Sequence, residues 1–128
     1  MNLAMNLSWV QFGSLMMFLA ITLGAFGSHA LKEKISADDM EIFKTGIFYH
    51  IIHALALFVV AWLTTISADP KVQFAGLFFI GGIFFFSGSL YLLSITEIKA
   101  LAFITPIGGL LFLFGWFLLL HAQYNKFL

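Results

Sequence analysis

The first charged side chain of this sequence is Lys32, and residues 9–31 form an uncharged, mainly apolar stretch. At about 1.5 Å per residue, roughly 23 helical residues reach about 34 Å, which is enough to cross a hydrocarbon core of about 30 Å. Three further stretches have the same character, over residues 46–66, 72–95 and 101–122. The sequence therefore predicts a single transmembrane domain over residues 1–128, in the all-α class: an integral membrane four-helix bundle.

Composition excludes several classes of protein. Hydrophobic residues make up 62% of the chain and charged residues 9%, whereas soluble domains carry about 25% charged residues. Six lysines balance six acidic residues, so the chain lacks the basic face that nucleic acid requires. The chain has no cysteine, which removes disulfides, thiolate metal sites and cysteine nucleophiles. The expected partners are the lipid bilayer and either a homo-oligomer or a larger membrane complex.

The loops predict how the helices are connected. Loop 1, residues 32–44, is polar and amphipathic, and Ser36 precedes Asp39 in the spacing of a capping box, so a helix is expected to restart there. Loops 2 and 3, residues 67–71 and 96–99, are short. Short loops between helices favour antiparallel neighbours, so an antiparallel bundle is expected.

The lysines predict an orientation in the membrane. Positively charged residues accumulate in cytoplasmic loops, and four of the six lysines lie on the side of loops 1 and 3. We therefore expect a multi-pass protein with these loops in the cytoplasm and both termini outside. The lysines on the two sides are Lys32, Lys34, Lys44 and Lys99 against Lys71 and Lys126.

Polar and small residues recur at helical spacing within the spans. A period of 3.6 residues places Gln11, Ser14, Thr22, Ala25 and His29 on one side of the first helix, which is expected to face protein. Two interpretations stay open for this pattern. Such residues commonly mediate helix packing, and alternatively they line a polar cavity or path for a solute, a proton or a lipid headgroup.

Three histidines, His29, His50 and His53, flank loop 1 in the sequence and are expected at similar depth. We predict that the side chains of His29 and His53 approach within hydrogen-bonding or one-water distance. Imidazoles in this arrangement are suited to Zn, Cu or haem. However, the chain has neither an H-E-x-x-H motif nor an arginine for haem propionates, so hydrogen bonding between helices is favoured and no metal ligand is assigned.

Glycines are expected where helix backbones approach closely, because glycine carries no Cβ. The candidate packing residues are Gly24, Gly27, Gly88, Gly108, Gly109 and Gly115.

Four ordered motifs resemble a known family. Residues 24–31, Gly-Ala-Phe-Gly-Ser-His-Ala-Leu, are similar to the pattern G-A-x-G-A-H-x-L, and residues 49–55, Tyr-His-Ile-Ile-His-Ala-Leu, to Y-Q-x-x-H-A-L. Residues 86–91 and 105–109 match the patterns of the third and fourth helices. Together these motifs resemble the YgdD/YwdK-like family of small membrane proteins. His50 stands where that family usually has glutamine.

The resemblance implies a fold and a location but no reaction, because the family is a domain of unknown function with members in the bacterial inner membrane. It narrows the candidate polar site within the membrane to the residues of the matching motifs. These are His29, His53, Ser87, Ser89, Tyr91 and Thr105.

Three functional hypotheses result. The first is a structural or accessory role in the inner (cytoplasmic) membrane, with no enzymatic activity, no catalytic residue and no cofactor. The second is a transporter-like module that binds a small molecule or a lipid through the candidate polar site. The third is a histidine-ligated metal or haem protein.

Overall fold

The computed structural model describes residues 3–124, and side chains from Ser8 onward. Helices account for nearly all of these residues, and none of them forms a strand. In chain order, the elements are α1 (Leu3–Thr22), η1 (Leu23–Gly27), α2 (Ser28–Leu31), α3 (Ala37–Ile66), α4 (Pro70–Gly82), η2 (Ile83–Ser87), α5 (Gly88–Thr96), η3 (Lys99–Phe103) and α6 (Thr105–Leu120).

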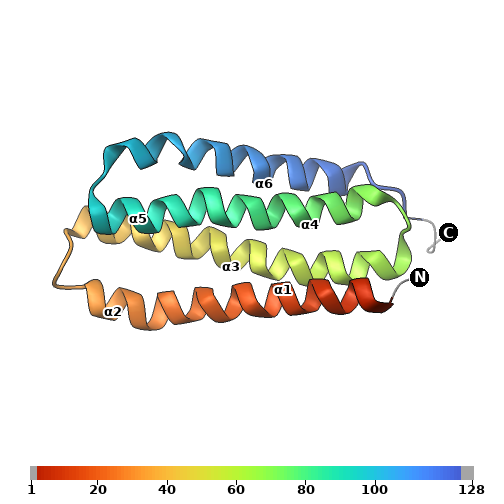
Figure 1. The fold of residues 1–128 in the computed structure, drawn as a ribbon, viewed down its shortest axis with the longest axis horizontal. Coiled ribbons are helices and arrows are strands. Elements are labelled where there is room, and N and C mark those ends of the chain that lie inside the picture. Colours follow the sequence, from red (N-terminus) through yellow and green to blue (C-terminus); the bar gives the residue numbers. More distant parts are fainter. Residues whose placement is uncertain (1–2, 125–128) are drawn as a thin grey trace.

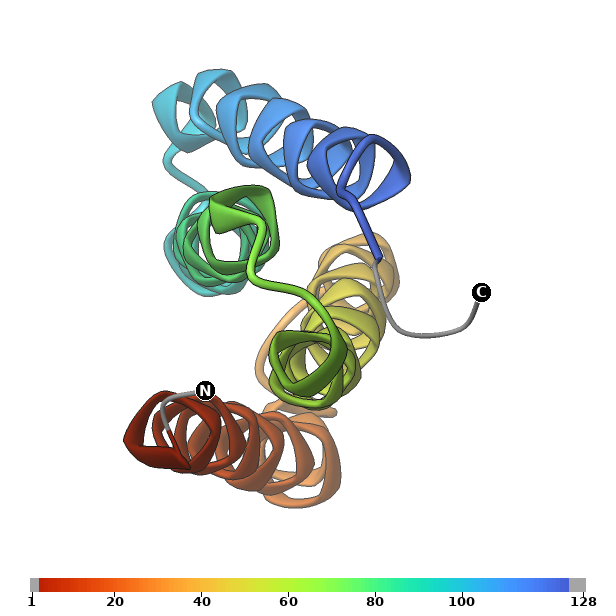
Figure 2. The same cartoon turned by 90° about the vertical axis from the view of Figure 1, so that its right-hand side faces the viewer.

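These elements form four long rods that run antiparallel (Figure 1). The rod α1–η1–α2 packs mainly on α3, and α3 packs in turn on α4, η2 and α5. Helix α6 covers α4 and η2, so α1 and α6 occupy the two outer positions of the bundle (Figure 2). The predicted all-α antiparallel four-helix bundle is confirmed.

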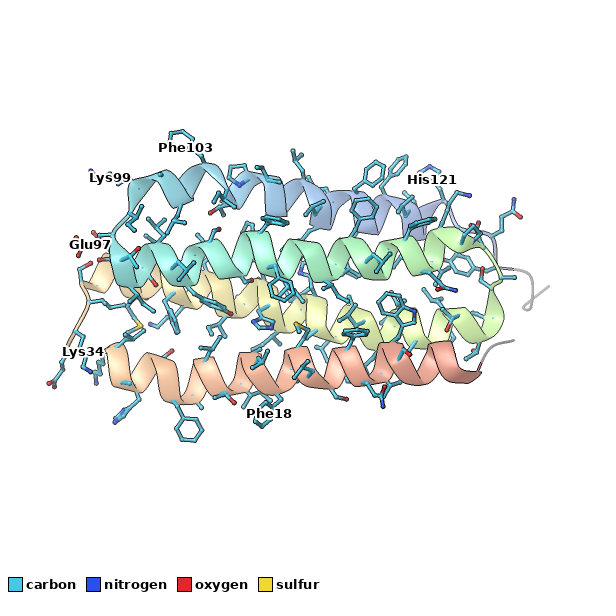
Figure 3. All side chains as sticks on the ribbon, in the orientation of Figure 1. Phe18, Lys34, Glu97, Lys99, Phe103 and His121 are labelled. Carbon is cyan, nitrogen blue, oxygen red and sulfur yellow. The ribbon has the colours of Figure 1, made fainter. Side chains whose placement is uncertain are left out.

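The surface of the bundle is suited to lipid. Four helical segments are long and apolar enough to cross a membrane: Ser8–Leu31, Ala37–Ile66, Pro70–Thr96 and Lys99–Leu120. Large apolar side chains such as Phe18 and Phe103 point away from the bundle, whereas Lys34, Glu97 and Lys99 lie at one end of it (Figure 3). The bilayer is therefore the natural surrounding of the long faces.

Helix α3 begins where the capping box predicted. The hydroxyl of Ser36 accepts a hydrogen bond from the backbone N–H of Asp39 at 3.1 Å and donates one to the Asp39 carboxylate at 2.6 Å. Only residues 32–36 of the predicted loop 1 lie outside a helix. The rest of that polar segment forms the first turns of α3, so this helix starts nine residues before the predicted span at residue 46.

Two long rods contain a π-helical turn, which the sequence analysis did not predict. The turns η1 and η2 interrupt the first and third rods, and each accommodates an extra residue relative to an α-helical turn. The fourth rod begins as the 3₁₀ helix η3 and becomes α-helical at Thr105. Pro106 explains this change, because proline is accommodated in the first turn of an α-helix but disrupts its interior.

Candidate functional site

Two histidines lie near the middle of α3. His50 and His53 follow Ala37 by 13 and 16 residues, so they lie roughly 20 and 24 Å along a helix that is about 45 Å long. Each side chain is 3% exposed. A buried polar group at this depth of a bilayer is costly unless it is hydrogen-bonded, and such groups are often functional.

His53 is hydrogen-bonded through both ring nitrogens. Its Nδ1 lies 2.7 Å from the backbone carbonyl of Tyr49 one turn earlier, and its Nε2 lies 3.1 Å from the indole Nε1 of Trp116 in α6. Because an indole N–H only donates, Nε2 is the acceptor and Nδ1 carries the proton. The ring of Phe112 stacks on the imidazole with centroids 3.5 Å apart. His53 is thus a neutral imidazole that ties α3 to α6.

His50 points to the other neighbours of α3. Its Nδ1 lies 2.9 Å from the hydroxyl of Tyr91 in α5. Its Nε2 is buried and has no hydrogen-bond partner among the described residues. The Met16 carbonyl of α1 is close enough to interact with the ring, but it forms no hydrogen bond of normal geometry with Nε2.

Serine hydroxyls at and after η2 complete the polar contacts. Ser87 donates to the carbonyl of Gly46 in α3 at 2.7 Å. Ser89 donates to the carbonyl of Phe86 at 2.9 Å, which satisfies an acceptor within the π turn. The hydroxyls of Ser89 and Thr105 lie 2.7 Å apart and join α5 to α6.

The structure therefore brings the candidate polar residues into separate pairs rather than into one cluster. Ser89 meets Thr105, while Ser87 and Tyr91 both contact α3. No group of three or more His, Asp or Glu side chains among the described residues is arranged to hold a metal ion.

His29 is exposed at the end of the first rod, and the predicted approach of His29 to His53 is wrong. His29 lies two residues before the end of α2, about 3 Å from it, whereas His53 lies about 24 Å into α3. The prediction placed His53 too close to loop 1 because α3 starts earlier than expected. In addition, His53 points toward α6, on which α1 does not pack.

The polar stripe of the first helix does not face the rest of this chain. Gln11, Ser14, Thr22, Ala25 and His29 are all exposed. Helix α1 packs mainly on α3 and therefore buries only one side, through Trp9, Gly13, Met16 and Ala20. The expectation that the stripe faces protein is wrong within one chain.

The candidate packing glycines differ in how tightly they are enclosed. A Cβ added to Gly108 would lie 2.2 Å from the backbone nitrogen of Phe86, and one on Gly115 would lie 2.6 Å from the Phe79 ring. A Cβ added to Gly24 would lie 3.3 Å from the Ile47 side chain of α3, and one on Gly27 would lie 3.0 Å from the Phe43 ring of the same helix. A Cβ added to Gly88 or Gly109 would lie 3.9 or 3.7 Å from the nearest atom, which is an ordinary van der Waals contact.

Sequence reasoning missed Trp116 as the partner of His53. A tryptophan in the middle of a span was a usable signal, because an indole N–H in the hydrocarbon layer has no water to bond and generally finds an acceptor on a neighbouring helix. Next to this pair, Tyr49, His53, Phe86, Phe112 and Trp116 line a groove of about 540 Å³ between α3 and α6. Its lining is mostly aromatic, so it provides stacking surface with few polar contacts.

Comparison with known proteins agrees with this architecture. Residues 23–109 match the family described as "Protein of unknown function (DUF423)". The UPF0382 membrane protein YwdK of Bacillus subtilis is 44% identical over 115 residues, covering 89% of this chain and 94% of the relative. The UPF0382 membrane protein SAB0533 of Staphylococcus aureus is 40% identical over 117 residues, covering 91% of this chain and 95% of the relative.

The UPF0382 inner membrane protein YgdD of Escherichia coli is 36% identical over 109 residues, covering 85% of this chain and 83% of the relative. No solved structure matches the chain significantly. Both names in the resemblance drawn from the four motifs are thus found among the relatives. This chain is a membrane protein that belongs to the DUF423 family of unknown function, together with the UPF0382 membrane proteins.

Proposed function

We propose that this protein is a non-catalytic accessory protein of the inner membrane, which associates with itself or with other membrane proteins through its long helical faces. The observation that supports this role is the use of its mid-membrane polar groups. His53, Ser87 and Ser89 are each engaged with a neighbouring helix. Hydrogen bonds of this kind hold helices together and leave these groups less available to a transported solute.

Native mass spectrometry of the protein in mild detergent, with metal analysis of the same sample, tests this role. We expect a homo-oligomer or a complex with another subunit, and no metal or haem at fixed stoichiometry. A stoichiometric metal or haem would overturn the accessory role in favour of a redox or metal protein. A monomer without any protein partner would also contradict it.

The exposed stripe of α1 is the proposed surface for self-association. Gln11 and Ser14 lie on the lipid-facing side of α1 and have no hydrogen-bond partner among the described residues. A carboxamide both donates and accepts, so a parallel second copy would present a complementary Gln11 at the same depth. Ser14 is small, which allows the two helices to approach closely.

Cysteine cross-linking in membranes tests this surface directly, because the chain has no cysteine of its own. Ser14→Cys is expected to form a disulfide-linked dimer under mild oxidation. Leu113→Cys, at an exposed position of α6, serves as the matched control and is expected to remain monomeric. Equal cross-linking at both positions would show random collision, and no cross-linking at Ser14→Cys would exclude a symmetric α1 interface.

The orientation with both termini outside is also a proposal. Four lysines lie at one end of the bundle. Lys32 and Lys34 are in the turn after α2, Lys44 is near the start of α3, and Lys99 begins η3. At the opposite end, Lys71 forms an ion pair with Asp69 at 3.2 Å, and Lys126 lies outside the described residues. This lysine distribution favours the first end as the cytoplasmic one.

Labelling of intact cells with a membrane-impermeant maleimide decides the orientation. Lys34→Cys and Ala68→Cys place single thiols in exposed turns at opposite ends of the bundle. We expect Ala68→Cys to react in intact cells and Lys34→Cys to react only after lysis. The reverse pattern would place both termini in the cytoplasm.

A further inference from the structure

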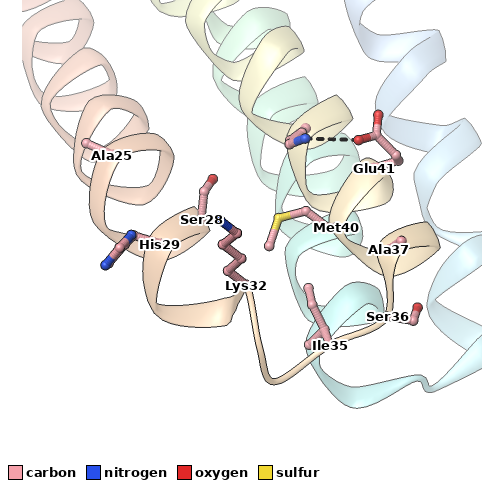
Figure 4. Close-up of a pocket in the computed structure, with 10 residues that line it drawn as sticks. Ala25, Ser28, His29, Lys32, Ile35, Ser36, Ala37, Met40 and Glu41 are labelled. Carbon is pink, nitrogen blue, oxygen red and sulfur yellow. Dashed lines mark hydrogen bonds and ion pairs between the residues drawn. The ribbon is translucent and has the colours of Figure 1, made fainter.

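A pocket of about 570 Å³ lies where the first rod ends and α3 begins (Figure 4). Its polar lining consists of Ser28, His29, Lys32, Ser36, Glu41 and Lys44. The pocket belongs to none of the mid-membrane pairs described above. It is a separate feature at the end of the bundle where most lysines lie.

The charges of the pocket leave one cation unpaired. The Nζ of Lys44 lies 3.0 Å from the Glu41 carboxylate, so these two charges largely compensate each other. Lys32 has no acidic partner among the described residues. Its side chain reaches toward Ser28, whose hydroxyl also has no hydrogen-bond partner in that part of the chain (Figure 4). One net positive charge and a free hydroxyl therefore both line the pocket.

The other lining groups limit what the pocket accepts. Ser36 already donates to the Asp39 carboxylate, and the His29 ring points away from α3 (Figure 4). Apolar side chains of Ile35 and Met40 complete the wall between the two rods. A ligand that combines one anionic group with an adjoining apolar part would match both kinds of surface.

The pocket also lies at the depth of lipid headgroups. The first span ends at Leu31, and Lys32 is the first residue beyond it. The first rod continues from the pocket into the membrane with exposed apolar side chains, among them Phe26 of η1, which is 73% exposed, and Phe18 of α1. A headgroup in the pocket would therefore leave its acyl chains against α1, in the hydrocarbon layer.

We propose that this pocket binds the phosphodiester of an anionic phospholipid that carries one negative charge, of the phosphatidylglycerol type. Lys32 contacts the phosphate as a point charge, and Ser28 donates a hydrogen bond to a phosphate oxygen. The single uncompensated lysine matches a single anionic charge, whereas a zwitterionic choline lipid would bring its own cation. This site does not depend on the accessory role, and self-association can fail while the site stands.

The test uses the purified full-length protein in mild detergent with added phosphatidylglycerol or phosphatidylcholine, and counts bound lipid by native mass spectrometry. We expect one retained phosphatidylglycerol and about fivefold weaker retention of phosphatidylcholine. Lys32→Gln is expected to reduce phosphatidylglycerol retention about fivefold, and Lys32→Arg to preserve it. The matched control Lys34→Gln removes the same charge two residues away, outside the pocket lining, and is expected to behave as the wild type.

Three outcomes would overturn the proposal. Equal losses in Lys32→Gln and Lys34→Gln would indicate a diffuse surface charge instead of a pocket. Equal retention of the two lipids would remove the role of headgroup charge. Displacement of phosphatidylglycerol by millimolar inorganic phosphate alone would identify a site for free phosphate, whereas unchanged retention supports the lipid.

Discussion

The indole N–H of Trp116 donates to Nε2 of His53 across 3.1 Å, and this hydrogen bond joins the centre of α3 to the outer helix α6. The two helices have few other close backbone contacts, because α6 packs mainly on α4 and η2. A side-chain hydrogen bond and the stacked Phe112 ring therefore bridge the space between α3 and α6.

Replacing Trp116 with phenylalanine is expected to destabilise the bundle by about 1 kcal/mol, the scale of a hydrogen bond between membrane helices. The new ring retains packing against Phe79, whose centroid lies 4.8 Å from that of Trp116. Denaturant unfolding in mixed micelles measures this loss. A double-mutant cycle with His53→Phe separates the pair from its surroundings, and additive losses would show that the hydrogen bond contributes nothing.

Gly108→Ala is expected to destabilise the protein by about 1–3 kcal/mol, because its Cβ would meet the backbone of Phe86 at 2.2 Å and backbone cannot move aside easily. Gly109→Ala is the matched control. There the new Cβ meets only the Phe86 ring at 3.7 Å, and alanine favours the helix by up to about 1 kcal/mol. Thermal unfolding monitored by circular dichroism compares the two variants. Equal effects would contradict the close helix contact.

His50→Gln is expected to leave stability nearly unchanged. A glutamine amide can pair with the Tyr91 hydroxyl and also donate toward the Met16 carbonyl, and glutamine is the residue that the family pattern usually has here. His50→Leu is expected to cost about 1 kcal/mol, since it leaves the Tyr91 hydroxyl without its present partner. Unfolding of both variants in micelles measures the difference, and an equal loss in both would show that shape alone matters at this position.

We expect the end of the bundle that carries Lys71 to lose stability in acid, because the Asp69 carboxylate accepts hydrogen bonds there. The backbone N–H groups of Lys71 and Gln123 both donate to its carboxylate at 2.9 Å, which holds the pKa of Asp69 below its usual range, with a smaller contribution from the Lys71 ammonium. Because the pKa is lower in the folded state, this stabilisation is complete above the unfolded pKa. It is lost as the pH falls through the folded pKa.

Hydrogen exchange of the segment after α6 checks this response. The Gln123 amide is expected to exchange faster, after correction for intrinsic rates, once Asp69 is protonated. Asp69→Asn keeps a side-chain acceptor for the N-cap of α4 but loses the negative charge. It is expected to abolish the pH dependence, and a response that persists in this variant would assign it to another group.

The sequence predicted the parts of the fold that depend on single segments. Apolar length identified four helices, and the Ser36 capping box located the start of α3. The site was predicted less completely. Ser87, Ser89, Tyr91 and His53 stood out as polar residues within spans, but their partners depend on how each helix is rotated, and side-chain chemistry alone does not specify that rotation.

The outer position of α1 was the main cause of error. A polar stripe was expected to face protein, because polar groups are costly in lipid, yet α1 has only α3 as a major neighbour. His29 was misplaced for a different reason, since depth was counted from predicted span ends instead of from true helix starts. Neither packing order nor an early helix start follows from hydropathy.

The π turn η2 gives its rod two different angular settings. Before it, α4 packs mainly against α6, and after it, α5 packs mainly against α3. One extra residue in a turn shifts the direction of every later side chain by about 100°. The buried positions nevertheless keep one α-helical period along the whole rod, at Val72, Phe79, Ile83, Ser87, Leu90 and Ser94. The turn therefore leaves the buried face of this rod intact in sequence while changing the helix that this face meets, from α6 before the turn to α3 after it.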